Sequence, residues 1–410
     1  MVGGLVRDLL LSRESKDIDL IVLSGPRGFA DAVAKRCGGS LRQHDRFLTA
    51  DFTSDAGYEI DVVRARSEVY RSPAALPTVR SGTLIEDLFR RDFTVNAMAL
   101  PLTGPDEDIV DPFHGYSDLK RGRLRVLHER SFLDDPTRLL RGLRLGHRLG
   151  LALEAHTAQL AEQALAQGAF DRLSGVRLRT ELQRLLHDPS TALDLLPNLA
   201  DLELESILHP QLVLPEMVTT CLGRMAADPG TETVHQWVTV LCALTWNLDS
   251  SQRAQVADRL SLDASDRRLL LELPPLVHSL SQRLETLDSA HERFQLGSTL
   301  GPIGRVLARC WAGPQVASFL ETEWPALCAR RPLISGRDLI GLGFAPDPSI
   351  GRALEATLRA RLEGRIGRTE ELLYAARWLQ QKATTDVDAR PDRSSRTDHL
   401  DSGDSGRGGR

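Results

Sequence analysis

Lysine, cysteine and aromatic residues are scarce in this sequence of 410 residues. The five cysteines lie far apart and form no CxxC pair, which argues against a zinc site or a disulfide framework and favours a reducing cytoplasm. No apolar run approaches the ~18 residues of a membrane span and no signal peptide opens the chain, so we expect no membrane association. Because only four lysines occur, nearly all positive charge is arginine, whose planar fork suits phosphates and base edges.

Length and composition indicate an ordinary globular protein. At ~150 residues per domain the chain corresponds to about two to three domains, and 41% apolar and 26% charged residues exclude wholesale disorder. The net charge of −5 gives no global reason to expect nucleic-acid binding. Residues 120–148, however, hold nine basic and three acidic residues, a local +6 that is typical of a phosphate-binding face or of a solvated helix face.

Strand and helix signals are mixed only in the first ~125 residues. Asp17–Leu23 and Tyr58–Val63 are short and β-branched, which predicts strands. Residues Pro26–Gly38 have helical spacing and end at a glycine pair, and 71–82, with two prolines, predicts a loop. From about residue 131 the pattern is helical, with apolar faces formed by Leu139, Leu140, Leu143 and Leu145 and by Leu178, Leu182, Leu185 and Leu186.

Two carboxylates lie two residues apart in the first predicted strand, Asp17 and Asp19. Residues i and i+2 of a strand point to the same face, where two negative charges repel unless they share cations. This arrangement suits one or two Mg²⁺ ions ~3.5–4 Å apart, although an isolated DxD is also common as two exposed aspartates.

A Gly-Gly turn lies upstream of this strand, in the segment Val2–Asp8. If Gly3 and Gly4 open a helix, their backbone N–H groups can approach a phosphate and Arg7 can add its fork. An ordinary tight turn fits the same residues, and the dinucleotide-binding fingerprint GxGxxG is not present here.

Arginines cluster in two further motifs. Arg90 and Arg91 precede Asp92, which could cap a helix. In DDPTRLLRGLR (134–144), Asp135 and Arg138 are predicted to be i, i+3 neighbours on a helix. An acceptor beside donors matches the edge of a nucleobase, and a local ion pair explains the same residues.

Together, these motifs point to one protein family much more specifically than any of them does alone. GGLVRD, KDIDL, RRDFTVNAMAL and DDPTRLLRGLR, in this order and approximate spacing, resemble the class II tRNA nucleotidyltransferase and bacterial poly(A) polymerase family. The stretches 174–186 and 334–365 add to the resemblance. It implies an α+β fold, in which a small mixed-sheet, polymerase β-like head precedes an all-helical neck, body and tail.

The resemblance and the pattern together predict five segments. These are a nucleotidyltransferase head at 1–125, a helical neck for nucleotide recognition and RNA binding at 126–190, a helical body at 191–330, an RNA-binding helical tail at 331–382, and a disordered, aliphatic-poor end at 383–410. Family members usually carry a strand and a helix before the Gly-Gly motif, so we expect this head to lack a supporting strand.

The resemblance also implies roles for named residues. The Mg²⁺ ligands and catalytic residues correspond to Asp17 and Asp19, with Asp61 a weaker third candidate. The triphosphate cradle corresponds to Gly3, Gly4 and Arg7, and the nucleotide-binding motif of the head to Arg90, Arg91 and Asp92. The base-reading pair corresponds to Asp135 and Arg138, and further nucleotide-site arginines to Arg141 and Arg144. The motif usually begins Glu-Asp, whereas Asp134 stands first here.

The implied reaction is nucleotide addition to a tRNA 3′ end without a nucleic-acid template, from CTP and ATP. The RNA 3′-hydroxyl attacks the α-phosphate and pyrophosphate leaves. Relatives add CCA, CC, the terminal A or poly(A). The uninterrupted segment 67–93 resembles one present in enzymes that add the terminal A, which argues against CC addition alone, and the absence of a long basic C-terminal extension argues against poly(A) polymerase. A non-catalytic RNA-binding protein is the remaining alternative.

Overall fold

The computed structural model describes residues 1–15, 17–22, 26–44, 49–102, 108–201, 203–227 and 236–388. Its chain divides into two compact units, Met1–Pro275 and Leu276–Arg410. The predicted domain boundaries at 125/126 and 190/191 therefore fall inside the first unit, and the boundary at 330/331 falls inside the second.

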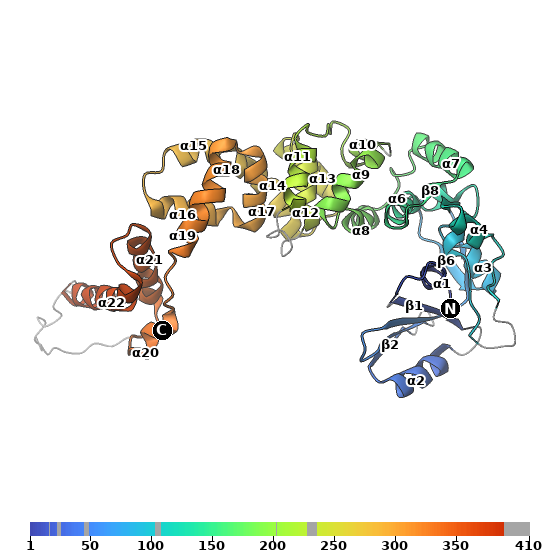
Figure 1. The fold of residues 1–410 in the computed structure, drawn as a ribbon, viewed down its shortest axis with the longest axis horizontal. Helices are drawn as coiled ribbons and strands as arrows, with labels where there is room; N and C mark the ends of the chain where they lie inside the picture. Colours follow the sequence, from blue (N-terminus) through green and yellow to red (C-terminus); the bar gives the residue numbers. More distant parts are fainter. Residues whose placement is uncertain are drawn as a thin grey trace, which may run out of the picture. The chain divides into compact units, whose positions relative to one another are not determined.

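A four-stranded mixed sheet with the order β1-β4-β3-β2 forms the start of the first unit (Figure 1). Strand β1 (Asp17–Val22) pairs in parallel with β4 (Glu59–Arg64), and β3 (Thr49–Thr53) pairs antiparallel with both β4 and β2 (Ser40–His44). Both strands predicted from their β-branched residues are confirmed within one residue at each end.

Helix α2 (Pro26–Cys37) covers the sheet, as its helical spacing predicts (Figure 1). The core between them contains Leu20, Ala30, Ala50 and Val62, all at most 8% exposed. The helix ends at Gly38, whose φ of +62° lies in the left-handed region that favours glycine. Because alternate residues of a strand point to opposite faces, Asp19 of β1 and Asp61 of β4 lie on the other face of the sheet.

The loop that we predicted at 71–82 is wrong for residues 78–81, which form a strand. Strand β6 (Thr78–Ser81) pairs antiparallel with β5 (Arg66–Val69), so the segment is a long-looped hairpin. Helix α3 (Leu84–Phe89) follows and packs on β5, and Thr83 starts it with a capping box to Glu86.

Short elements then lead into the helical part. The 3₁₀ turn η1 (Thr94–Asn96) contacts α4 (Gly115–Lys120). Strand β7 (Arg123–Leu124) pairs in parallel with β8 (Ala152–Leu153). Strand β8 is an exception to the helical pattern that we predicted from about residue 131 onward.

Residues 126–190, the range that we predicted for the neck, contain α5 (Ser131–Asp134), α6 (Thr137–Leu149), α7 (Ala155–Ala166) and α8 (Gly175–Leu185). Helix α6 packs on α8, and Leu178, Leu182, Leu185 and Leu186 are fully buried, which confirms that face as a core face. The helices that complete the unit are α9 (Pro189–Asp201), α10 (Leu204–Leu208), α11 (Val218–Ala227), α12 (Gln236–Leu244), α13 (Ser250–Arg259) and α14 (Ala264–His278), the last of which continues past Pro275.

The second unit is helical throughout its described residues. It contains α15 (Leu280–Glu285), α16 (Ala290–Thr299), α17 (Gly301–Trp311), α18 (Pro314–Ser318), the π-turn η3 (Phe319–Glu323), α19 (Trp324–Ala329), α20 (Gly336–Gly341), α21 (Pro348–Leu362), the 3₁₀ turn η4 (Arg368–Glu370) and α22 (Glu371–Asp388). Helices α21 and α22 lie side by side (Figure 1).

Helix α22 corrects one prediction. It runs to Asp388, so residues 383–388, which we predicted to be disordered, are helical, and the rest of that segment lies outside the described residues. The sequence there has few aliphatic residues, but a helix that is anchored in a core by its first turns can continue past its last apolar contact. None of the helices described is both long enough and apolar enough to cross a membrane.

Candidate active site

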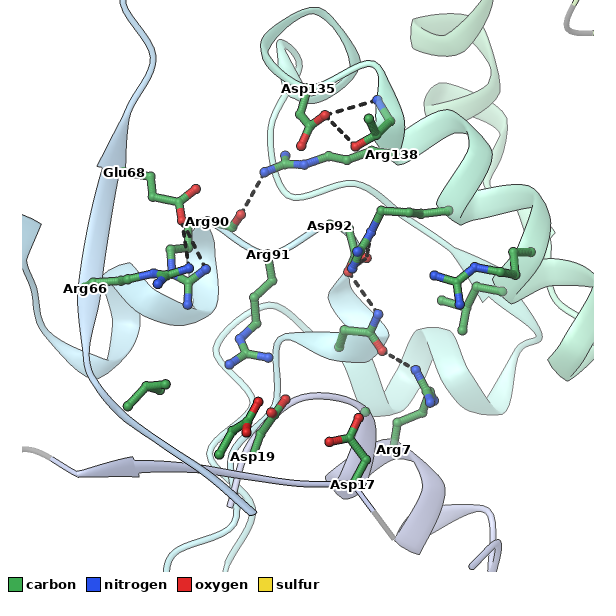
Figure 2. A pocket seen from close by; sticks show the side chains of 18 of the residues that line it. Arg7, Asp17, Asp19, Arg66, Glu68, Arg90, Arg91, Asp92, Asp135 and Arg138 are labelled. Atoms are coloured by element: carbon green, nitrogen blue, oxygen red, sulfur yellow. Dashed lines mark hydrogen bonds and ion pairs between the residues drawn. The ribbon is translucent and has the colours of Figure 1, made fainter. Parts of the chain in front are cut away.

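A cavity of about 520 Å³ in the first unit is lined by eight arginines and six carboxylates (Figure 2). Asp17 and Asp19 lie at one end, Asp135 and Arg138 at the other, and Arg91 between them. All predicted site residues except Gly3 line this cavity, namely Gly4, Arg7, Asp17, Asp19, Arg90, Arg91, Asp92, Asp135, Arg138, Arg141 and Arg144. The fold therefore collects motifs that the sequence spreads over about 140 positions.

Three carboxylates meet at the sheet end of the cavity. The parallel pairing of β1 with β4 puts Asp19 opposite Asp61, and oxygens of Asp17, Asp19 and Asp61 all lie within 4.8 Å of one another. Burial raises the pKa of Asp19. Burial and the neighbouring negative charges raise the pKa of Asp61 to about 6. Such a cluster is costly without a cation, and oxygen-only ligands suit Mg²⁺.

Gly3 supports this cluster from outside the cavity. Helix α1 (Gly4–Leu10) begins directly after it, as predicted, and Gly3 has a φ of +74°. A Cβ atom here would meet the Arg91 guanidinium and lie 3.1 Å from Asp19 Oδ2. Its N–H donates to the Met98 carbonyl (3.2 Å), so this donor is committed to the fold rather than to a phosphate, contrary to our prediction.

Arg7 is held rigidly inside the head. Its side chain is buried, its Nε donates to Asp8 Oδ1 (2.8 Å), and its Nη1 donates to Asn96 Oδ1 (2.5 Å). Burial lowers the pKa of Arg7, and Asp8 opposes this shift. The guanidinium therefore lines the cavity in one orientation.

The arginine pair 90–91 is organised by one buried carboxylate. Arg90 Nη2 lies 2.9 Å and Arg91 Nη2 3.3 Å from Asp87, which is fully buried on α3. Arg90 Nη1 also lies 3.2 Å from Glu68 of β5. Because Asp87 neutralises part of their charge, the two guanidiniums can lie in neighbouring positions and face the cavity together.

Asp92 does not cap a helix, which corrects our prediction. The turn that follows begins after Phe93, and Asp92 Oδ1 accepts from the Phe93 N–H and the Asn96 amide (both 2.9 Å). Asp92 Oδ2 accepts from Arg141 Nη2 (2.6 Å). Burial alone would raise the pKa of Asp92, but Arg141 and these hydrogen bonds lower it to about 2.

We expect Asp92→Asn to lower the free energy of unfolding by about 2–3 kcal/mol, because it leaves Arg141 without its charge partner. The ordinary pKa of an aspartate is ~3.9 and that of folded Asp92 is about 2. The contribution is therefore complete above pH ~4 and disappears as the pH falls from 4 towards 2. Urea unfolding of both proteins from pH 2 to 7 measures it. Asp194→Asn, at a side chain that is 63% exposed, should show no such difference. A pH-independent gap would contradict the assignment.

Asp135 and Arg138 are not the ion pair that their spacing predicts. Asp135 binds Arg177 Nη2 (2.7 Å), and Arg138 donates to the Arg90 carbonyl through Nη2 (2.7 Å) and to the Ser131 hydroxyl. Helix α6 begins at Thr137, whose N–H donates to Asp135 Oδ1 (3.0 Å). Tertiary partners have replaced the i, i+3 contact, and both side chains still line the cavity.

The two remaining arginines of α6 have different environments. Arg141 pairs with Asp92, and this interaction raises its pKa. Arg144 Nη2 lies 3.8 Å from Glu181 of α8, and burial lowers its pKa. Arg144 Nε is buried without a hydrogen-bond partner among the described residues.

Sequence reasoning missed several residues of the cavity wall. Glu68 binds both Arg90 and the Tyr70 hydroxyl (3.1 Å), and burial together with Glu68 raises the pKa of Tyr70 to about 12. Asn96 connects Arg7 with Asp92. Asn96 lies inside the motif RRDFTVN, so a polar residue in that motif was the available signal. Glu68 lies inside segment 67–93, whose resemblance assigns no role to an individual residue.

The fold and the cavity define a class of protein. A small mixed sheet that carries clustered carboxylates opposite arginines, followed by helices, is a nucleotide-transfer head with a helical extension. Residues 1–125 match the Poly A polymerase head domain family.

Comparison with known proteins makes the assignment specific. The A-adding tRNA nucleotidyltransferase of Halalkalibacterium halodurans is 32% identical over 385 residues, which cover 92% of this chain and 87% of that protein. The CC-adding tRNA nucleotidyltransferase of Deinococcus radiodurans is 31% identical over 385 residues, which cover 92% of this chain and 88% of that protein. The structure of the Thermotoga maritima CCA-adding enzyme complexed with tRNA(CCA) has a TM-score of 0.65 at 30% identity, over 93% of this chain and 90% of that one. This chain belongs to the family of class II tRNA nucleotidyltransferases and bacterial poly(A) polymerases.

Proposed function

We propose that this protein adds CCA, or its terminal A, to the 3′ end of tRNA without a template, from CTP and ATP. The observation that carries the proposal is the single cavity that holds three clustered carboxylates, a row of arginines and the Asp135–Arg138 motif. Its size and its many cationic side chains suit one nucleoside triphosphate.

The residues at the sheet end fit Mg²⁺. Three carboxylates within 4.8 Å supply only oxygen donors, and the raised pKa of Asp61 reflects burial and negative charge that a cation would offset. Asp17 and Asp19 would hold the metal, with Asp61 as a third ligand. A Mg²⁺ ion held there would favour ionisation of the RNA 3′-hydroxyl and would offset charge at the α-phosphate.

The arginines are proposed to bind and orient the triphosphate. Arg91 lies nearest the carboxylates and so faces the position of the reacting phosphate (Figure 2). Arg90 and Arg91 are aligned by Asp87, and Arg7 by Asp8 and Asn96. Preorganised donors of this kind stabilise developing negative charge without reorganising during the reaction. No protein nucleophile is required, because the RNA hydroxyl attacks in line and pyrophosphate leaves.

The remaining predicted residues complete the nucleotide site. Gly3 gives the start of α1 its close approach to Asp19 and Arg91, and Gly4 lies against Arg7. Asp92 orients Arg141, and Arg144 adds positive charge. Asp135 and Arg138 read the base at the other end. We propose the helical tail, 331–382, as an RNA-binding segment, and a cytoplasmic location remains a prediction from the cysteine usage.

Three tRNA transcripts test the function: one that lacks CCA, one that ends in C and one that ends in CC. Each is incubated with Mg²⁺ and labelled CTP or ATP, separately and together. We expect at least the transcript ending in CC to receive one A and then to stop. Addition of C, C and A in sequence identifies a complete CCA-adding enzyme, and addition of A alone identifies an A-adding one.

The double variant Asp17→Ala/Asp19→Ala is the control and should incorporate nothing. Long A ladders on unrelated RNA would instead indicate a poly(A) polymerase. RNA affinity without Mg²⁺-dependent nucleotide binding or incorporation would indicate a non-catalytic RNA-binding protein and would contradict the proposal.

A further inference from the structure

Arg148, in the last turn of α6, lines the cavity without having been assigned a role so far. Its Nη2 donates to Asp8 of α1, at 3.2 Å from Oδ2 and 3.4 Å from Oδ1. Asp8 is 8% exposed, whereas the side chain of Arg148 is 52% exposed. A contact across 140 positions of sequence therefore connects α6 with the first helix of the chain.

The Asp8 carboxylate is shared between two guanidiniums. Arg7 approaches Oδ1 alone, with Nε at 2.8 Å and Nη2 at 2.7 Å. Among the described residues, Arg148 is the side chain that donates to Oδ2. Because each oxygen has its own donor, the rotation of the carboxylate is fixed, and so is the Arg7 guanidinium that rests on it.

The other side of Arg7 leads back to the same helix. Arg7 Nη1 donates to Asn96, the Asn96 amide donates to Asp92, and Asp92 accepts from Arg141 of α6. Arg141 and Arg148 are seven residues apart, about two turns, so both lie on one face of α6. Helix α6 thus holds Arg7 through a hydrogen-bonded path at either end.

The place of Arg7 in the cavity suggests which phosphates it binds. Arg7 and Arg91 lie on different sides of Asp17 in Figure 2. We assign the reacting phosphate to Arg91, so Arg7 is left for the phosphates that depart as pyrophosphate. Its N–H groups that are not directed at Asp8 or Asn96 can donate to them.

We propose that Arg148 is a positioning residue for the pyrophosphate end of the nucleotide: by holding Asp8, it keeps Arg7 directed at the β- and γ-phosphates. This inference rests on the proposed function. Without Arg148, Oδ2 of Asp8 is a buried acceptor that lacks its donor, which is costly. The carboxylate then turns towards other donors, and Arg7 turns with it. The field of Arg148 itself contributes little, since a half-exposed charge is screened by solvent.

Arg148→Met tests this inference, since methionine keeps much of the apolar stem and removes the donors. In the presence of Mg²⁺ we expect the Kd for ATP to rise about tenfold, as for the loss of one charge-assisted hydrogen bond. The Kd for AMP, which lacks the β- and γ-phosphates, should stay unchanged. Competition against a fluorescent ATP analogue on the full-length protein measures both constants.

A second variant shows whether Arg148 acts through Asp8. In Asp8→Asn the carboxylate is gone, so the double variant Asp8→Asn/Arg148→Met should have the same Kd for ATP as Asp8→Asn alone. Arg13→Met is the matched control: Arg13 also carries a positive charge at this contact, where its Nη1 donates to the Arg148 carbonyl (3.2 Å), but it does not line the cavity. Its Kd for ATP should equal that of the wild type.

Three results would overturn the inference. They are an unchanged Kd for ATP in Arg148→Met, an equal weakening of ATP and AMP, which indicates a purely structural role, and the same loss of ATP affinity with and without Asp8, which indicates direct contact of Arg148 with a phosphate. If Arg148→Met does not fold, Arg148→Gln, which also lacks the charge, is measured in the same way against the same outcomes. Wild-type protein that binds no ATP in the presence of Mg²⁺ would instead contradict the proposed function, and this inference with it.

Discussion

Asp19→Asn is expected to lower the rate of nucleotide addition at least about 1000-fold, which corresponds to a loss of about 4 kcal/mol of transition-state stabilisation. Asp19 lies at the centre of the site: it faces Asp61 across the β1–β4 pair, and its carboxylate and the Arg91 guanidinium both lie against Gly3. Asparagine has the same shape and presents one oxygen, but it lacks the charge that the metal requires. Single-turnover extension of tRNA ending in CC measures the effect.

The same substitution should not destabilise the fold. It removes one of three like charges within 4.8 Å, so we expect the thermal midpoint of the metal-free protein to stay level or rise. Asp51→Asn is the matched control: Asp51 faces Asp61 from β3 and contributes to the raised pKa of Asp61, but it does not line the cavity. The Asp51→Asn protein should retain the activity of the wild type. An Asp19→Asn protein that is folded and active would exclude Asp19 as a metal ligand.

The sequence predicts the end of this site that holds Asp17 and Asp19 better than the end that holds Asp135 and Arg138. Asp17 and Asp19 are two positions apart in one strand, so strand geometry alone brings them to one face. Asp61 was only a weak candidate, because its proximity depends on the register of β1 against β4, which no local pattern encodes. Gly3 was assigned to a phosphate from its Gly-Gly turn, whereas its N–H is committed to Met98.

At the end that holds Asp135 and Arg138, local spacing predicted the wrong hydrogen-bond partners. An i, i+3 pair is worth only about 0.2–0.5 kcal/mol. A partly buried, charge-assisted hydrogen bond is worth more, so Asp135 pairs with Arg177, 42 positions away, and Arg138 with the Arg90 carbonyl. Asp92 and Arg141, 49 positions apart, form a pair for the same reason. Local motifs identified which residues belong to the cavity, and tertiary packing decided which of them touch.

Asp135→Asn is expected to change which base is selected, by about 100-fold in the ratio of kcat/KM for ATP to that for GTP. The three donors at Oδ1 require an oxygen in that position, so the asparagine amide must turn its NH₂ group to the position of Oδ2. The acceptor offered to the base thereby becomes a donor. The asparagine side chain therefore loses the hydrogen bond to the adenine amino group and gains one to the guanine keto oxygen.

Asp135→Ala distinguishes a change in base recognition from simple damage to the site. Alanine offers neither donor nor acceptor, so we expect it to relax selection among the nucleotides without favouring GTP, and to lower overall turnover with ATP less than it lowers selection. Misincorporation into tRNA ending in CC, with each nucleoside triphosphate alone and with all four in competition, measures both variants. If Asp135→Asn kept the wild-type preference for ATP, the base would not be read at Oδ2. Arg177 and Thr137 hold Oδ1 of Asp135, on which the base is not proposed to be read. Adding Arg177→Met to Asp135→Asn therefore tests the orientation of this side chain. If the gain of GTP use then vanishes, orientation as well as charge selects the nucleotide.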